Sequence, residues 1–285
     1  MSKTIKIIAE IGKNFIDTEE ELTPEQYLDK AKILVQQAKE SGADIVKFQC
    51  HVFQDEQHKR SPSRYEWIER NEQATPLGRF WIPLQEYCQD NDIEFLCTPM
   101  SQLSAQKINP LVSMWKIGSA DITDLRLLTY IANTGKPIII SSGMSTLGQI
   151  DEALELIQTI HLDNLIQPKV TLMHCVSLYP CPIESSNLAT IALFKKRYPS
   201  LRIGYSSHTL SHLDALGAVF MGASVIEKHF TLDRGAFGPD HKVSLLPHEF
   251  KDMVDNIRQA ETIIGQEEKI LLKEEQGYWT NFRKI

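Results

Sequence analysis

The stretch RIGYSSHTLSHLDALGAVFMGASVIEKHFT (202–231) holds a complete strand–helix–strand unit. Two apolar runs, RIGYSS (202–207) and SVIEKHF (224–230), flank the apolar segment LDALGAVFMG (213–222). Strands that read as nearly continuous hydrophobic runs are typical of a parallel sheet that is covered on both faces. Two parallel strands joined by a helix are therefore expected here.

The same alternation of strand and helix recurs along the whole chain. The other strands are expected at 5–12, 43–52, 93–100, 113–122, 137–144 and 170–180. The other helices are expected at 24–42, 79–92, 101–111, 125–135, 147–161, 187–199 and 247–265. Eight such units in one chain of 285 residues predict an α/β fold, a TIM (β/α)8 barrel in a single domain. A doubly wound open sheet is the alternative, but no Gly-rich dinucleotide fingerprint follows the first strand.

The longest segment without a regular pattern is HVFQDEQHKRSPSRYEWIERNEQATP (51–76), after the second strand. Irregular loops of this length are usually functional or mobile. We therefore interpret 51–76 as a flap over the mouth of the barrel. No linker between domains is found, so residues 1–285 are expected to form one barrel domain.

The composition excludes several classes of protein. The formal net charge is −7 and no dense stripe of lysine and arginine occurs, so a nucleic-acid role gains no support. No apolar run approaches the length of a membrane span, and the N-terminal stretch does not resemble a signal peptide. The five cysteines are odd in number and show no CxxC spacing, which favours reduced thiols in a cytoplasmic protein.

In a TIM barrel the chemistry takes place at the C-terminal ends of the strands. Those ends are polar here, at Glu10, Lys47, Gln49, Thr98, Lys116, Ser119, Asp121, Ser141, Ser142, Ser177, Ser206, His208, Glu227 and His229. A lysine inside an apolar strand is costly unless it meets an anion. Lys47 and Lys116 therefore indicate either an internal ion pair with Glu10 or Glu227, or a pocket for a phosphate or carboxylate.

The acid Glu10 and the histidine pair His208 and His229 have two interpretations each. Glu10, isolated in IIAEIG, is a candidate acid or base, or else a structural partner of Lys47. His208 and His229 suit a divalent cation with open positions for a substrate oxygen. Two histidines with ordinary hydrogen-bond partners are equally consistent with that pair alone. Asp240, in GPDH, reads from spacing alone as a turn residue.

Eight motifs that occur in a fixed order resemble the sialic acid synthase (N-acetylneuraminate synthase) family. They are IAEIGKN (8–14), GADIVKFQ (42–49), CTPM (97–100), WKIGSADIT (115–123), GKPIIISSGMST (135–146), LMHCVSLYPCP (172–182), GYSSHTL (204–210) and IEKHFTLDR…GPDH (226–241). The resemblance spans about 8–265. It implies a TIM barrel that condenses phosphoenolpyruvate with an N-acetylated aldose to give a nonulosonic acid and phosphate.

The resemblance also implies roles for single residues. Lys47, and Lys116 with Ser119, resemble the groups that hold the carboxylate and phosphate of phosphoenolpyruvate. Ser206 matches another phosphate-contacting serine, whereas Ser177 stands where many relatives carry asparagine. His208 and His229 correspond to the two ligands of Mn²⁺ or Mg²⁺, and Glu10 to a glutamate beside the metal and the aldehyde. The positions of the acceptor-sugar contacts correspond to Gln49, Asp121, Tyr179 and Asp240.

The chain departs from the family pattern at three places. Phe15 replaces a histidine and the following glycine is absent, which is expected to alter the floor of the sugar site. Ser207 stands where an aspartate usually precedes the metal histidine. Many relatives continue into an antifreeze-like domain that is exchanged across a homodimer, whereas this chain stops at Ile285. The 51–76 segment, Arg283 or a separate closing polypeptide could fill the place of that domain.

The expected reaction is therefore a metal-dependent attack of C3 of phosphoenolpyruvate on the aldehyde carbon of an open-chain sugar. Water adds at C2, and the C–O bond to phosphate breaks. Two alternatives stay open. One is a related 3-deoxy-ulosonate synthase that uses another or a phosphorylated aldose, and the other is a catalytically silent barrel that binds a sugar or a partner.

Overall fold

The computed structural model describes residues 5–163, 169–265 and 268–282 of the chain. Its eight strands are β1 (Lys6–Gly12), β2 (Ile45–Cys50), β3 (Glu94–Pro99), β4 (Trp115–Ile117), β5 (Ile138–Ser141), β6 (Val170–Cys175), β7 (Arg202–Ser207) and β8 (Val225–His229). They pair in parallel in the order β3-β2-β1-β8-β7-β6-β5-β4, and β3 also contacts β4. The predicted TIM barrel is confirmed.

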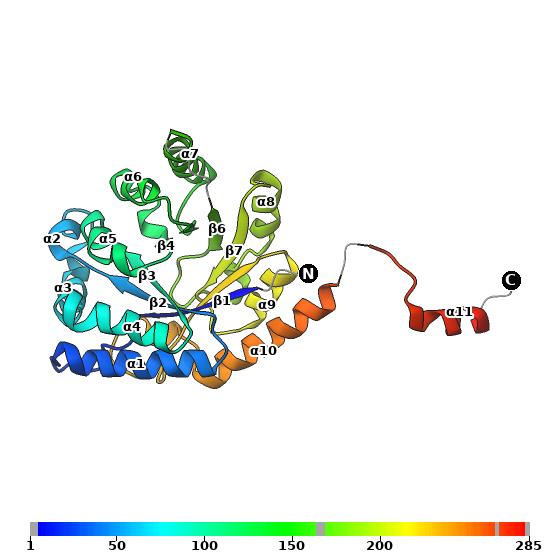
Figure 1. Ribbon diagram of the computed structural model, residues 1–285, viewed down its shortest axis with the longest axis horizontal. Coiled ribbons are helices and arrows are strands. Elements are labelled where there is room, and N and C mark those ends of the chain that lie inside the picture. The colour runs from blue at the N-terminus through cyan, green and yellow to red at the C-terminus, as the bar shows by residue number, and fades with distance from the viewer. Residues whose placement is uncertain (1–4, 164–168, 266–267, 283–285) are drawn as a thin grey trace.

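Helices surround the ring of strands, as Figure 1 shows. Those that follow the strands are α1 (Pro24–Glu40), α4 (Ile82–Asp90), α5 (Gln102–Ile108), α6 (Leu125–Asn133), α7 (Leu147–Asp163), α8 (Ala189–Arg197), α9 (Leu213–Phe220) and α10 (Pro247–Ile264). Local signals explain where they begin. In α1, Thr23 accepts a hydrogen bond from the Gln26 amide while the Gln26 side chain accepts from the Thr23 amide, and Pro24 holds the first helical position.

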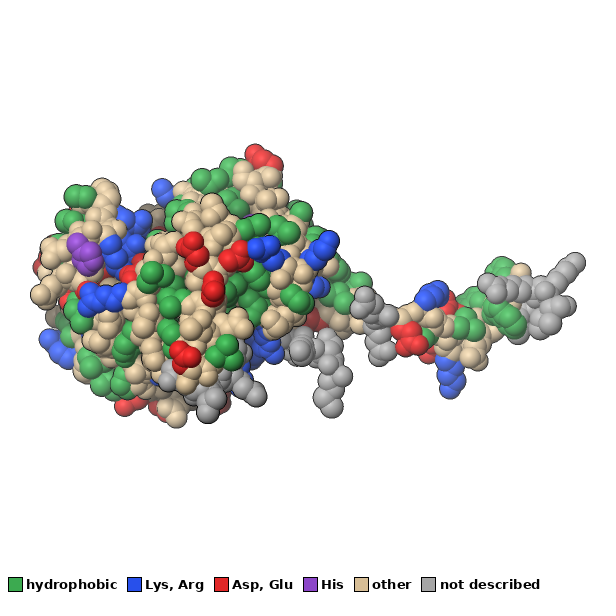
Figure 2. All heavy atoms as spheres, turned by 90° about the horizontal axis from the view of Figure 1, so that it is seen from above, with side chains coloured by type: hydrophobic (Ala, Val, Ile, Leu, Met, Phe, Trp, Pro, Cys, Tyr) green, Lys and Arg blue, Asp and Glu red, His purple; other side chains and the backbone are tan. Residues whose placement is uncertain are grey.

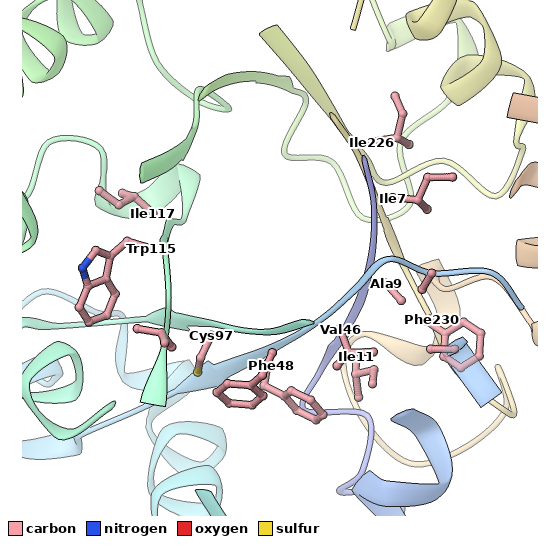
Figure 3. Packing of buried hydrophobic residues seen from close by; sticks show 14 of the residues in the cluster. Ile7, Ala9, Ile11, Val46, Phe48, Cys97, Trp115, Ile117, Ile226 and Phe230 are labelled. Carbon is pink, nitrogen blue, oxygen red and sulfur yellow. The ribbon is translucent and has the colours of Figure 1, made fainter. Parts of the chain in front are cut away.

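Each strand alternates between two environments, because successive side chains point to opposite faces. The outward residues pack against the helices in the main core; Figure 3 shows Phe48, Cys97, Trp115 and Ile226 on this side of the strands. The inward residues at the bottom of the barrel form a small apolar cluster of Ile8, Ile45, Leu96, Ile139, Met173 and Val225. The polar strand ends lie directly beyond this apolar layer.

The 51–76 segment is not an irregular loop, which corrects the prediction. It contains α2 (Phe53–Glu56), a 3-10 turn at Pro62–Arg64, and α3 (Tyr65–Ala74). In α3, Ile68, Asn71 and Ala74 are buried at a spacing of three, so one stripe of this helix packs inward. The segment is folded against the barrel, although its residue composition is mostly polar.

A last helix, α11 (Gln276–Phe282), stands away from the barrel beyond the end of α10, as Figures 1 and 2 show. The exposed side chains of this end of the chain include Ile270, Leu271, Leu272 and Phe282. Arg283 lies outside the described residues, so its expected role is not addressed by the structure. No helix within the described ranges is long and apolar enough to cross a membrane.

Candidate active site

A layer of buried charges lies inside the barrel, one pleat beyond the apolar cluster. Its members follow inward residues of that cluster by two positions: Glu10 follows Ile8, Lys47 follows Ile45, and Glu227 follows Val225. The strand register places Glu10 beside Lys47, because β1 and β2 pair at these residues. Period-two alternation therefore brings polar groups from separate strands into one plane.

Glu227 links the two buried lysines. Its Oε1 lies 3.6 Å from Nζ of Lys47 and 3.6 Å from Nζ of Lys116, and it accepts a hydrogen bond from the Ser206 hydroxyl at 3.0 Å. Burial alone would raise the pKa of Glu227, but the two lysines hold it well below its ordinary value. Glu227 is therefore ionised and shared between both ammonium groups. From the sequence, Glu227 was predicted only as a possible ion-pair partner of one buried lysine.

The two lysines differ in how well their charges are matched. Lys47 Nζ lies 2.7 Å from Oε2 of Glu10 and also donates to the Thr98 hydroxyl at 3.1 Å. Lys116 Nζ donates to the Ser141 hydroxyl at 2.7 Å, and its nearest carboxylate is Glu227 at 3.6 Å. Burial lowers the pKa of Lys116, although Glu227 counteracts this effect. An anion beside Lys116 would restore the stabilisation that burial removes.

Ser119, Gly143 and Ser177 form a cluster of hydrogen-bonding groups, the Gly143 cluster, in which Gly143 lies two residues beyond Ser141, whose hydroxyl contacts Lys116. The Gly143 amide donates to the Ser119 hydroxyl at 3.1 Å, and Ser177 Oγ is buried without a hydrogen-bond partner among the described residues. A Cβ added at Gly143 would lie 2.3 Å from Ser177 Oγ and 2.7 Å from Ser119 Oγ. The hydroxyls of Ser119 and Ser177 therefore meet at Gly143, where they are suited to bind the oxygens of an anion. The predicted site residues Ser119 and Ser177 meet here, and Gly143 was missed.

We expect Gly143→Ala to disrupt the Gly143 cluster. The added methyl group would overlap with two hydroxyls that sit at the ends of separate loops, so at least one hydroxyl must move. We expect the Km for the anionic substrate to rise about tenfold or more, the size of a lost hydrogen bond to a charged group. Gly78→Ala is the matched control, because a Cβ there meets nothing within 4 Å. An unchanged Km in the Gly143 variant would contradict an anion-binding role.

A second polar group surrounds Gly12 at the end of β1. Gln49 donates to Oε1 of Glu10 at 2.7 Å, and Lys13 donates to Gln49 at 3.1 Å and lies 3.8 Å from Asp240. Gly12 has a φ of +58°, and a Cβ at this position would come within 3.0 Å of Gln49 and 3.1 Å of Glu10. Glycine lets the backbone turn closely past these side chains. The structure thus brings Gln49, Glu10 and Asp240 together, with Lys13 as an addition.

The two histidines are neighbours, with ring centroids 5.4 Å apart. His208 Nδ1 lies 2.7 Å from the Val176 carbonyl and must donate to it, so Nε2 is the nitrogen left with a lone pair. Burial lowers the pKa of His229 to about 3, against the pull of Asp240, and its Nδ1 has no hydrogen-bond partner in the described part of the chain. The ring of Tyr179 lies 4.1 Å from that of His208.

Burial lowers the pKa of His208, but contacts with Cys175 and the Val176 carbonyl raise it overall. In their neutral forms the two imidazoles fit a divalent cation, because each then retains a nitrogen lone pair and a carbonyl orients one of them. Within the described ranges, no group of three His, Cys, Asp or Glu side chains could hold a metal ion by itself. The protein would therefore supply two ligands and leave the other positions to water or substrate oxygens. The prediction of Mn²⁺ or Mg²⁺ at His208 and His229 stays a prediction.

Three residues lie elsewhere than expected. The Ser142 hydroxyl donates to the Met173 carbonyl at 2.8 Å, and its neighbour Ser141 contacts Lys116 instead. The Ser207 hydroxyl donates to Asp214 at 2.6 Å, so this departure from the family pattern leaves the Val176 carbonyl as the partner of His208 Nδ1. Phe15 is fully buried with its ring 4.9 Å from Phe80, and the expectation that it alters the floor of the sugar site stays a prediction.

Asp121 connects the strand ends to the 51–76 segment. Both carboxylate oxygens accept from Nη2 of Arg60 at 2.6 Å, and Lys59 lies 3.2 Å from one of them. Arg60 also contacts the Met100 carbonyl at 3.4 Å. Asp121 thereby anchors this segment at the end of β4. The predicted contact of Asp121 with a sugar therefore has to form while the same carboxylate is paired with Arg60.

Comparison with known proteins adds a family. The model of the NeuB family matches residues 34–269. An uncharacterised protein of Methanocaldococcus jannaschii is 39% identical over 96% of this chain and 80% of its own length. The N,N′-diacetyllegionaminic acid synthase of Campylobacter jejuni is 36% identical over 97% of this chain and 82% of its own. The crystal structure of an N-acetylneuraminic acid synthetase from Leptospira borgpetersenii, in complex with citrate, superposes with a TM-score of 0.85 at 28% identity, covering 99% and 93% of the two chains.

Proposed function

The chain belongs to the NeuB family, and we propose that it condenses phosphoenolpyruvate with an N-acetylated aldose to give a nonulosonic acid and phosphate. The names of the relatives from Campylobacter jejuni and Leptospira borgpetersenii support this class of reaction. They name different products, so they leave the acceptor sugar open. The observation that carries the proposal is the buried ammonium of Lys116, which has no carboxylate closer than Glu227 at 3.6 Å and lies on the strand that leads to the Gly143 cluster through Ser119.

Phosphoenolpyruvate carries its carboxylate and its phosphate on the same carbon, C2, so it needs two cationic groups near each other. Lys47 and Lys116 both lie 3.6 Å from the same Glu227 oxygen, so their ammonium groups are held close together. We assign the phosphate to Lys116 and the Gly143 cluster of Ser119, Gly143 and Ser177, with Ser206 as a further hydroxyl. The carboxylate then lies toward Lys47 and Thr98. Such positioning supplies much of the rate enhancement in a two-substrate reaction.

The acceptor is proposed to bind on the side of Gly12, near Gln49, Asp240 and the half-exposed Tyr179. The electron pair of the C2–C3 double bond of phosphoenolpyruvate forms the bond from C3 to the aldehyde carbon, and the aldehyde oxygen takes up a proton. A water oxygen adds at C2 and gives up one proton. The C2–O bond to phosphate then breaks while C2 forms a double bond to the added oxygen, whose second proton is released. Burial and Glu227 raise the pKa of Glu10 despite the nearby Lys47. Glu10 is therefore suited to accept the proton of the attacking water at Oε2, the atom 2.7 Å from Lys47 Nζ.

His208 and His229 are proposed to hold Mn²⁺ or Mg²⁺, which when bound polarises a carbonyl oxygen. The Val176 carbonyl keeps the His208 ring in the tautomer that presents Nε2. Tyr179 covers both rings, at 4.1 Å and 6.3 Å between centroids, and limits the access of water to them. A homodimer, a separate closing polypeptide and a cytoplasmic location remain proposals; the five free, buried cysteines are consistent with the last.

We would test the reaction by measuring phosphate release from phosphoenolpyruvate with Mn²⁺. The acceptor panel is N-acetylmannosamine, its 6-phosphate and diacetamido hexoses, with a parallel size-exclusion run to give the subunit number. Release that depends on one acceptor, and that is lost in Lys116→Met, would support the proposal and identify the sugar. Release only with the 6-phosphate would favour the synthase of phosphorylated products. Binding of phosphoenolpyruvate without release on any acceptor would favour a silent sugar-binding or partner-binding barrel.

A further inference from the structure

Lys228 is a buried lysine that the proposed reaction does not use. It lies on β8 between Glu227 and His229, and its side chain points away from the interior of the barrel toward α9. The side chain is fully buried. Its three N–H groups have three acceptors: the Ser207 hydroxyl at 2.6 Å, the Thr209 hydroxyl at 3.0 Å and the Ser211 carbonyl at 2.8 Å. The ammonium group therefore has a complete set of hydrogen bonds inside the wall.

These acceptors lie on both sides of His208 in the sequence. Ser207 precedes it and Thr209 follows it, while Lys228 itself immediately precedes His229. The Thr209 amide also donates to the Ser207 hydroxyl at 3.3 Å, and the Thr209 hydroxyl donates to the Ser211 carbonyl at 2.9 Å. One ammonium group thus connects the turn that carries His208 to the strand that carries His229. Both imidazoles lie on the opposite face of this connection.

The carboxylate that balances Lys228 comes from α9. Asp214 Oδ1 lies 3.7 Å from Lys228 Nζ, while Oδ2 accepts from the Ser207 hydroxyl at 2.6 Å and from the Tyr205 hydroxyl at 2.8 Å. Ser207 therefore bridges the ammonium and the carboxylate. The register pairs Ser207 directly with Lys228 across β7 and β8, so an aspartate at position 207 could reach the same ammonium from the strand.

We propose that Lys228, Ser207 and Asp214 form a positioning unit that sets the separation of His208 and His229, with Asp214 supplying the carboxylate from α9. The inference rests on the proposed two-histidine cation site. None of the three side chains touches substrate in this proposal. They act by fixing the backbone on either side of the two ligands, in the way that outer partners of metal ligands maintain affinity.

The test compares Mn²⁺ affinity across a set of variants of the full chain, measured by electron paramagnetic resonance without substrate. We expect Asp214→Ala to weaken Mn²⁺ binding about tenfold or more. The double variant Asp214→Ala with Ser207→Asp moves the carboxylate to the strand, and we expect it to restore the affinity to within about threefold. Phosphoenolpyruvate affinity in metal-free buffer is expected to stay unchanged in all of them, because Lys47 and Lys116 lie on other strands.

Two further variants distinguish positioning from general stability. Asp44→Ala removes a carboxylate that pairs with Arg258 at 2.9 Å and accepts from the Ile7 amide, at the opposite end of the barrel. It is expected to lower the melting temperature without changing Mn²⁺ affinity. Asp214→Asn retains the shape of the side chain and serves if Asp214→Ala does not fold, with the same expected loss of affinity.

The outcomes separate the two levels of inference. If Asp214→Ala or Asp214→Asn lowers the melting temperature but binds Mn²⁺ as the unmodified protein does, the positioning unit is wrong. Failure of the double variant to restore affinity while it restores the melting temperature would also overturn it. If instead His208→Ala binds Mn²⁺ normally, the cation site itself is wrong, and the failure belongs to the proposed function.

Discussion

Replacing Lys116 with methionine is expected to lower kcat/KM for phosphoenolpyruvate about 10²- to 10³-fold, the usual cost of removing one partner from a buried charge pair. Lys116 is the less well matched of the two buried lysines, with one hydrogen bond to Ser141 and a carboxylate at 3.6 Å. Its charge is therefore available to the phosphate. Methionine has a similar length and no charge, so the barrel should still fold. Phosphate release and phosphoenolpyruvate binding measure the effect.

The matched control is Lys136→Met. Lys136 is a partly buried lysine whose ammonium donates to Asn109 Oδ1 and to the Val112 carbonyl, each at 2.8 Å, beyond the N-terminal end of β5. The same substitution there is expected to reduce stability without changing the Km for phosphoenolpyruvate. If the Lys116 and Lys136 variants lose phosphoenolpyruvate affinity equally, the effect is structural, and the assignment of the phosphate to Lys116 fails.

Lys47→Met should differ from Lys116→Met in a specific way. Lys47 contacts Glu10 at 2.7 Å, so its removal leaves a buried carboxylate without its closest cation. Breaking a buried pair in this way destabilises a protein by about 3–5 kcal/mol. We therefore expect a lower melting temperature as well as weaker phosphoenolpyruvate binding, whereas Lys116→Met should show mainly the binding defect.

The sequence was sufficient to predict the barrel because its eight strand–helix units are separated by clear changes of pattern. It was less informative about which side chain at each strand end faces inward. In IIISS, the serines Ser141 and Ser142 follow three isoleucines, so no alternation of polar and apolar residues indicates the register. A shift by one residue reverses the face, and only the structure shows that Ser141 contacts Lys116 while Ser142 bonds the next strand.

The 51–76 segment was misread for a different reason. Its helices are short, and tertiary contacts hold them rather than a strong local preference. Buried Glu56 accepts from the Val52 amide and contacts His51, and Arg60 reaches Asp121 on another strand end. The contact between Arg60 and Asp121 joins residues 61 positions apart in the sequence, so it leaves no local pattern. The spacing of Ile68, Asn71 and Ala74 was a usable signal for α3, although the asparagine conceals it.

His208→Ala is expected to reduce turnover by at least about 10³-fold, since a two-ligand cation site cannot lose half of its protein ligands and still orient a bound aldehyde. Phosphoenolpyruvate binding should persist, because the contacts of His208 within the described residues are with Val176, Cys175, Tyr179 and His229 rather than with Lys47, Lys116 or the Gly143 cluster. This split between turnover and binding is the reverse of that expected for Lys116→Met. Parallel measurement of phosphate release, Mn²⁺ affinity and phosphoenolpyruvate affinity would reveal it.

His212→Ala is the matched control, because it removes an imidazole from the same turn at the start of α9 and outside the His208–His229 pair. It should retain near-normal turnover. Near-normal activity of the unmodified protein in metal-free buffer, or of His208→Ala with Mn²⁺, would exclude the cation role. If instead the unmodified protein is active in metal-free buffer but His208→Ala is inactive, the ring acts only through its packing against Tyr179, at 4.1 Å between centroids. In that case His208→Phe, which keeps an aromatic ring there, should restore activity, whereas a ligand role predicts that it does not.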